Sequence, residues 1–205
     1  MKKLSIAVMI SGSGSNLQSI IDACNAGSLP AAVKLVISDR KDAFGLERAK
    51  KNGIPAEFID PSHFGGREEH ETACAASIDR EECKLICLAG YMRLVTGWFV
   101  GKYSGRLLNI HPSLLPSFPG AHAHRDVLAY GAKVSGCTVH FVDENMDSGP
   151  VIIQSAVKVL EGDTEETLGK RVLEQEHKAY PEAIKLFAEG RLIVKGRKVT
   201  VDTII

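Results

Sequence analysis

Residues 4–27, LSIAVMISGSGSNLQSIIDACNAG, decide the fold class of this chain. Residues 4–10 are nearly all apolar, as expected of a strand that is covered on both faces of a sheet. The turn SGSGSN follows, and Ser15–Ala26 then carries apolar residues at helical spacing, with Gly27 positioned to end the helix. A buried strand, a glycine-rich turn and an amphipathic helix predict the first part of a βαβ unit.

The same alternation continues along the chain. Further strands are predicted at Val33–Ser38, Ala56–Ile59, 84–90 and 106–110, and helices at Ala43–Asn52, Arg67–Glu81 and around Trp98–Tyr103. This pattern predicts an α/β protein with a Rossmann-like, three-layer arrangement, in which a mostly parallel central sheet has helices on both faces. After Ile110 we expect a long loop (111–124), two strands (133–142 and 151–159), a helix (Glu165–Glu189) and a hairpin that turns at KGRK (195–198).

Composition argues against several classes of protein. Lys and Arg together number 25, as do Asp and Glu, so the chain lacks the basic surplus typical of nucleic-acid or anionic-membrane binding. No apolar run reaches the roughly 18 residues of a membrane span. The five cysteines are scattered and odd in number, which indicates buried, reduced thiols. We therefore expect a cytoplasmic protein with one domain, residues 1–205, and with no nucleic-acid or membrane partner.

The turn SGSGSN raises the question of its ligand, because a helix N-terminus favours an anion. A triphosphate-binding loop requires Gly-Lys-Ser/Thr where Ser15 and Asn16 stand, so ATP is not expected. A dinucleotide fingerprint requires a third glycine where Leu17 stands, so NAD is not expected either, although Asp39 lies near the usual place of a ribose-binding acid. A single phosphate fits best, and a helix cap without a ligand is the alternative.

Polar chemistry begins at NIHPSLLPSFPG. Asn109 and His111 are two residues apart at a strand end, so their side chains share one face. An amide donor beside an imidazole suits acyl transfer. The alternative is that both residues are structural, with Asn109 capping a turn and His111 lying in a loop. A catalytic imidazole needs a carboxylate partner, and Asp143, Glu144 and Asp147 are candidates that spacing alone does not separate. The H-x-H pair at 122 and 124 lacks a third ligand at motif spacing, so no metal is predicted.

Five motifs together are recognisable. SGSGSN, AGYMRLV, NIHPSLLPSFPG, SGCTVHFVDENMDSGP and QEHKAYP occur in this order across essentially the whole chain. In this respect the chain resembles the phosphoribosylglycinamide formyltransferases, folate-dependent enzymes of purine biosynthesis. The resemblance implies a formyltransferase fold, with a phosphate-binding half (1–105) and a catalytic and folate-binding half (106–205) that includes the C-terminal helix and hairpin.

The resemblance also implies roles for individual residues. The catalytic residues would be Asn109, His111 and Asp147, and the residues that bind the phosphorylated substrate would be Gly14, Ser15, Asn16 and Glu176. The folate-binding residues would be Arg67, Met92, Arg93, Leu94, Val95, Asn109, Val142, Asp143 and Asp147. Apart from the resemblance, His140 and Thr138 are candidates for supporting the catalytic residues, and a hydrogen-bonded, partly buried His140 without such a role is the alternative.

The implied reaction moves a formyl group from the co-substrate 10-formyltetrahydrofolate to the amine of 5-phosphoribosyl-glycinamide, without metal, ATP or NAD. The expected partners are these small molecules, with a second copy of the chain in a homodimer as an open question. A formyltetrahydrofolate hydrolase, which directs water to the formyl group, is the first alternative function. A non-catalytic phosphate-sensing module is the second, although such a sensor would not need the three polar residues of the catalytic set.

Overall fold

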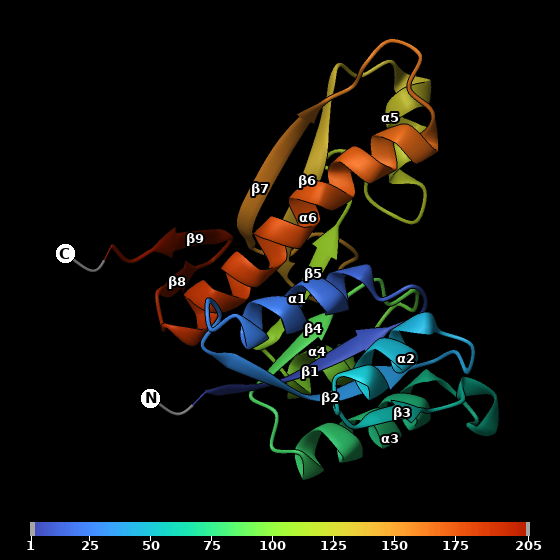
Figure 1. Cartoon of the computed structure of the whole chain (residues 1–205), viewed down its shortest axis with the longest axis vertical. Helices are drawn as coiled ribbons and strands as arrows, with labels where there is room; N and C mark the ends of the chain where they lie inside the picture. Colours follow the sequence, from blue (N-terminus) through green and yellow to red (C-terminus); the bar gives the residue numbers. More distant parts are fainter. Residues whose placement is uncertain (1–2, 204–205) are drawn as a thin grey trace. The chain divides into compact units, whose positions relative to one another are not determined.

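The computed structural model describes residues 3–203; residues 1–2 and 204–205, the ends of the predicted domain 1–205, lie outside it. The chain forms two compact units, one up to Leu108 and one from Asn109 onward (Figure 1). Strand β5 (Leu107–His111) carries the chain from the first unit into the second.

The first unit is a parallel sheet with helices on both faces. Its sheet has the order β3-β2-β1-β4, with each neighbouring pair parallel. The chain moves across the sheet in one direction from β1 to β3 and in the opposite direction after β3. Because each crossover is right-handed, α1 and α2 lie on one face of the sheet and α3 and α4 on the other (Figure 1). The predicted α/β class is confirmed. The elements are β1 (Leu4–Ile10), α1 (Ser15–Asn25), β2 (Ala31–Ser38), α2 (Phe44–Lys51), β3 (Ala56–Phe58), a 3-10 turn (Pro61–His63), α3 (Arg67–Arg80), β4 (Leu85–Leu88) and α4 (Gly97–Lys102).

Burial explains the apolar sequence of the central strands. Residues 6–10 of β1 are fully buried, and β4 is buried along its whole length. The loops that leave these two parallel strands meet at the carboxyl edge of the sheet. There the Ser11 N–H donates to the Gly90 carbonyl at 3.1 Å, and the Ser11 hydroxyl accepts from the Met92 N–H at 2.8 Å.

The second unit combines a sheet and two helices. β6 pairs antiparallel with β7, β9 is parallel to β7, and β8 and β9 form the predicted terminal hairpin. Helix α6 packs along β6 and β7 and buries an apolar stripe that includes Leu168 and Ile184 (Figure 1). The elements are α5 (Ala123–Tyr130), β6 (Val134–Phe141), β7 (Val151–Lys158), α6 (Glu165–Ala188), β8 (Leu192–Lys195) and β9 (Lys198–Val201).

One expectation for this unit is wrong. The segment 111–124 was expected to be loop throughout, yet α5 begins at Ala123 and ends at Tyr130, where the C-cap Gly131 has a φ of 77°. The helix has only eight residues, and its N-cap is His122 rather than a typical capping residue. Packing stabilises it, because Val127 is fully buried. The short turn at Pro61–His63 was likewise not predicted.

The cysteines agree with the expected buried thiols. All five are buried thiols, and burial raises the pKa values of Cys74 and Cys137 to about 12. None of the helices within residues 3–203 is long and apolar enough to cross a membrane.

Candidate active site

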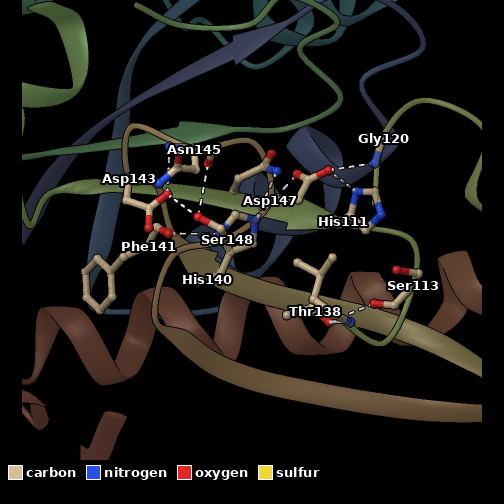
Figure 2. Close-up of polar contacts among 12 residues, drawn as sticks. His111, Ser113, Gly120, Thr138, His140, Phe141, Asp143, Asn145, Asp147 and Ser148 are labelled. Carbon is tan, nitrogen blue, oxygen red and sulfur yellow. Dashed lines mark hydrogen bonds and ion pairs between the residues drawn. The ribbon is translucent and has the colours of Figure 1, made fainter. Parts of the chain in front are cut away.

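His111 is the centre of a polar cluster in the second unit (Figure 2). Its side chain is nearly buried at the end of β5, with Nδ1 3.3 Å from Asp147 Oδ2 and Nε2 2.9 Å from the Phe118 carbonyl oxygen. Both partners are acceptors, so only the doubly protonated imidazolium donates to both. A carboxylate and a carbonyl oxygen thus face the two nitrogens of the His111 ring.

Asn109 lies beside a second buried histidine. Its Nδ2 is 3.3 Å from His140 Nε2, and His140 Nδ1 is 2.8 Å from the Phe141 carbonyl oxygen. The carbonyl only accepts, so Nδ1 carries the proton and Nε2 accepts from the Asn109 amide. Burial lowers the pKa of His140, which favours this neutral form. This contact orients the Asn109 side chain with its amide nitrogen toward His140. The second N–H of the same nitrogen can then donate to a ligand.

The loop between β6 and β7 supplies the carboxylate. Of the three acids that spacing left open, Asp147 is the one beside His111, and its Oδ2 also accepts from the Gly120 N–H at 2.9 Å. Asp143 instead accepts from the Ser148 hydroxyl at 2.7 Å and the Asn145 N–H at 3.1 Å within the loop (Figure 2). Glu144 is exposed.

The base of this loop is pinned by Gly149. The Phe141 N–H donates to the Pro150 carbonyl at 2.9 Å, and a Cβ added to Gly149 would lie 1.8 Å from the Phe141 carbonyl oxygen. Glycine is therefore required in the SGP motif, because the two ends of the loop approach each other directly at this point.

Thr138 fastens the segment that follows His111. Its hydroxyl donates to the Ser113 carbonyl at 2.7 Å and accepts from the Leu115 N–H at 3.0 Å (Figure 2). Phe118, further along the segment, has a φ of 53°, and its ring meets Tyr130 of α5 edge-on at 5.7 Å. Thr138 thus acts through the segment 113–118, whereas His140 touches Asn109 directly.

The glycine loop in the first unit lines a cavity of about 330 Å³. Gly14 is the N-cap of α1, with a left-handed φ of 67°, and it has no side chain that could cap the helix. The N-terminus of a helix presents main-chain N–H groups and a partial positive charge, which suit an anion. Lining residues are Ser11, Gly12, Ser13, Gly14, Ser15, Asn16, Arg40, Ala89, Gly90 and Met92.

The remaining predicted residues lie as follows. Arg67 is exposed at the start of α3, Met92 and Leu94 are 70% and 57% exposed after β4, and Arg93 and Val95 are half-buried. Val142 and Asp143 are half-buried in the β6–β7 loop of the second unit. Glu176 is buried on α6. Burial raises the pKa of the Cys137 thiol, and the negative charge of Glu176 raises it further.

Sequence reasoning missed the main-chain partners of the catalytic candidates. The Phe118 carbonyl and the Gly120 N–H carry no side-chain signature, so only the folded loop identifies them. Arg40 was also missed, although its position just after a strand end could have suggested it. No group of three or more His, Cys, Asp or Glu side chains in the described part of the chain is arranged to hold a metal ion.

A parallel α/β unit with an anion-sized cavity, followed by an Asn–His–Asp cluster, is the combination expected of a one-carbon acyl transferase. The chain belongs to the formyl transferase family, which matches residues 4–184. It is 48% identical over 189 residues to the phosphoribosylglycinamide formyltransferase of Escherichia coli (strain K12), covering 92% of this chain and 89% of that protein.

Two further relatives are similar to nearly the whole of this chain. The crystal structure of glycinamide ribonucleotide transformylase 1 from Symbiobacterium toebii is 53% identical, with a TM-score of 0.96, covering 98% of this chain and 94% of that one. The trifunctional purine biosynthetic protein adenosine-3 of Gallus gallus is 47% identical over 192 residues, which is 94% of this chain. This chain spans 19% of the length of that trifunctional protein.

Proposed function

We propose that this chain transfers the formyl group of 10-formyltetrahydrofolate to the amine of 5-phosphoribosyl-glycinamide, giving N-formylglycinamide ribonucleotide and tetrahydrofolate. The observation that supports the proposal is His111 held between two acceptors, Asp147 and the Phe118 carbonyl, beside the Asn109 amide. Preorganised donors of this kind stabilise the negative oxygen that develops in acyl transfer.

The chemistry requires one nucleophilic addition and one elimination. The amine lone pair attacks the formyl carbon, and the carbonyl π electrons move to oxygen, which gives a tetrahedral oxyanion. Asn109 Nδ2 donates to that oxygen, and the protonated His111 shares its Nδ1–H between Asp147 Oδ2 and the oxyanion. The proton of the attacking nitrogen then passes to N10 of the folate through water held by Asp147, and the C–N10 bond breaks as the carbonyl reforms.

Asp147 has two tasks in this scheme. Its negative charge balances the imidazolium of His111, and its second oxygen, Oδ1, which lies 3.9 Å from His140 Nε2, is assigned to the water that carries the proton. The Gly120 N–H bond holds the carboxylate so that Oδ2 stays toward His111. His140 keeps the Asn109 amide turned as a donor, and Thr138 holds the segment that bears the Phe118 carbonyl.

We assign the substrate phosphate to the cavity at Gly14, Ser15 and Asn16, whose volume of about 330 Å³ admits a phosphate and part of a sugar. Glu176 is assigned to the glycinamide ribonucleotide, as the family motif implies. The folate is assigned to Arg67, to the run Met92–Val95 and to the β6–β7 loop, with the pterin against apolar side chains and its glutamate tail toward Arg67 or Arg93. These small molecules are the partners of the enzyme, which we place in the cytoplasm; a homodimer stays a prediction.

Loss of the formyl group from 10-formyltetrahydrofolate, followed by absorbance, tests the function directly. We expect deformylation that depends on 5-phosphoribosyl-glycinamide and produces its N-formyl derivative in equal amount. Deformylation without the glycinamide would instead identify a formyltetrahydrofolate hydrolase. A folded protein that binds phosphate but leaves the formyl group intact would identify the phosphate-sensing module.

A further inference from the structure

Helix α2 lies against the back of the glycine loop. The Gly45 N–H donates to the Gly12 carbonyl at 3.1 Å. A Cβ added to Gly14 would lie 2.6 Å from Gly45 Cα, and one added to Gly45 would lie 2.3 Å from Ile10 Cδ1. The two backbones therefore touch at Gly14 and Gly45, and a side chain at Gly14 would collide with the backbone of α2.

Arg48, one turn further along α2, reaches the same loop. Its Nε donates to the Ser13 carbonyl at 2.8 Å and its NH1 group to Gln18 Oε1 on α1 at 3.2 Å. The guanidinium also lies over the Phe44 ring, 4.9 Å from the ring centroid. Three contacts thus hold the half-buried guanidinium in one place. One of them is to the glycine loop and one is to α1, the helix that follows the loop.

These bonds determine which way the loop peptides face. In a planar trans peptide the C=O and N–H groups point in opposite directions. Because the carbonyls of Gly12 and Ser13 are both turned toward α2, the N–H groups of Ser13 and Gly14 are turned away from it. The loop lines its cavity on that other side, since α2 contributes none of the lining residues within 3–203. Successive N–H groups that converge on one side form an anion site.

We propose that Arg48 is a positioning residue for phosphate binding: with Gly45, it holds two loop carbonyls against α2 and so directs the Ser13 and Gly14 N–H groups at the substrate phosphate. This inference rests on the proposed function, which places a phosphate in this cavity. Arg48 acts through the loop and does not touch the ligand, whereas Arg40 is the cation that lines the cavity itself.

The test is binding of inorganic phosphate and of 5-phosphoribosyl-glycinamide to the whole protein by calorimetry, in the wild type, Arg48→Met and Lys51→Met. Lys51 is the matched control, because it has the same charge on the same helix and lies over the same Phe44 ring at 5.8 Å. We expect Arg48→Met to weaken the binding of both ligands about 10- to 100-fold, as for loss of a charged hydrogen bond, and Lys51→Met to leave it unchanged.

Kinetics separate positioning from general damage. Arg48→Met should raise KM for the phosphorylated substrate by the same factor, with kcat and KM for the folate unchanged. The dephosphorylated substrate, which makes no phosphate contact, should react equally with both proteins. Arg48→Lys keeps the charge and most of the stem, so it serves if Arg48→Met does not fold, and it should recover part of the lost affinity.

Wild-type phosphate affinity in Arg48→Met, or an equal loss in Lys51→Met, would overturn the inference while leaving the proposed function in place. In the second case long-range charge, and not the orientation of the loop, would be responsible. A wild-type protein that binds neither phosphate nor the phosphorylated substrate would overturn both the inference and the proposed function.

Discussion

His111 Nδ1 lies 3.3 Å from Asp147 Oδ2, and Asp147 itself has a left-handed backbone with a φ of 51°. Phe118, whose carbonyl oxygen lies 2.9 Å from His111 Nε2, is also left-handed, with a φ of 53°. This conformation is uncommon outside glycine and clusters at functional sites. The chain thus adopts unfavourable backbone at the two positions that together define the orientation and charge of His111.

Removal of either proposed oxyanion donor should lower kcat strongly. We expect His111→Ala and Asn109→Ala each to reduce kcat by about 10²–10³ or more, because a preorganised donor to the developing oxyanion is lost. The measurement is steady-state formyl transfer, with circular dichroism to establish folding. His63→Ala, which removes an exposed histidine, is the control and should keep full activity. Near-normal turnover of folded His111→Ala would disprove the assignment.

Asp147→Asn isolates the charge of the carboxylate. The amide oxygen of Asn can still accept from the Gly120 N–H, so the loop keeps its anchor, but no negative charge faces the His111 imidazolium. We expect kcat to fall by at least about 10². Glu144→Gln removes one negative charge from an exposed position of the same loop and should have little effect on the rate. Equal losses in the two variants would mean that overall loop charge is responsible.

The buried His140 and the half-buried His124 should make the fold less stable in mild acid. Burial lowers the pKa values of His140 and His124, despite nearby Asp147 and Glu165, which oppose the shift. The unfolded chain therefore binds protons that the folded chain does not, at pH values below the ordinary histidine pKa of about 6.5. The contribution to stability is present above that value and is lost as the pH falls below it.

Urea unfolding at a series of pH values measures this effect. We expect the free energy of unfolding to fall as the pH drops through about 6.5, and to fall less steeply in His140→Gln. The His140 ring resonances should titrate with a midpoint below about 6.5 in NMR spectra of the folded protein. A midpoint at or above that value would contradict the neutral form that orients Asn109.

Gly149→Ala should open the β6–β7 loop. The added methyl group would collide with the Phe141 carbonyl, so the Phe141–Pro150 hydrogen bond must move. We expect a loss of about 1–3 kcal/mol in the free energy of unfolding, as for other overpacked sites, together with a fall in kcat as Asp147 shifts. Gly101→Ala on α4 is the control, because no heavy atom among the described residues lies within 4 Å of its added Cβ. Unchanged activity in Gly149→Ala would show that the contact at the base of the β6–β7 loop does not position Asp147.

The regular elements with strong periodicity were predictable from sequence. The strands β1 and β4 are buried on both faces, so their sequences are nearly continuous apolar runs. Helix α6 is buried along one stripe, so its apolar residues recur at helical spacing. Helix α5 was not predictable, because it is short, has the untypical N-cap residue His122 and depends on burial of Val127.

By itself, the sequence determined the α/β class, the family and the residue types of the candidate site. Asn109 and His111 share a face because the side chains of a strand alternate, which is a local property of the backbone. Residue spacing did not separate Asp147 from Asp143 and Glu144, and only the family resemblance implied Asp147. The tertiary structure places Asp147 beside His111, joins the Phe118 carbonyl to His111 and brings Arg48 to the Ser13 carbonyl. These contacts join residues from 7 to 36 positions apart in the chain, and several involve main-chain groups that every residue carries. Only the folded path of the loops can specify them.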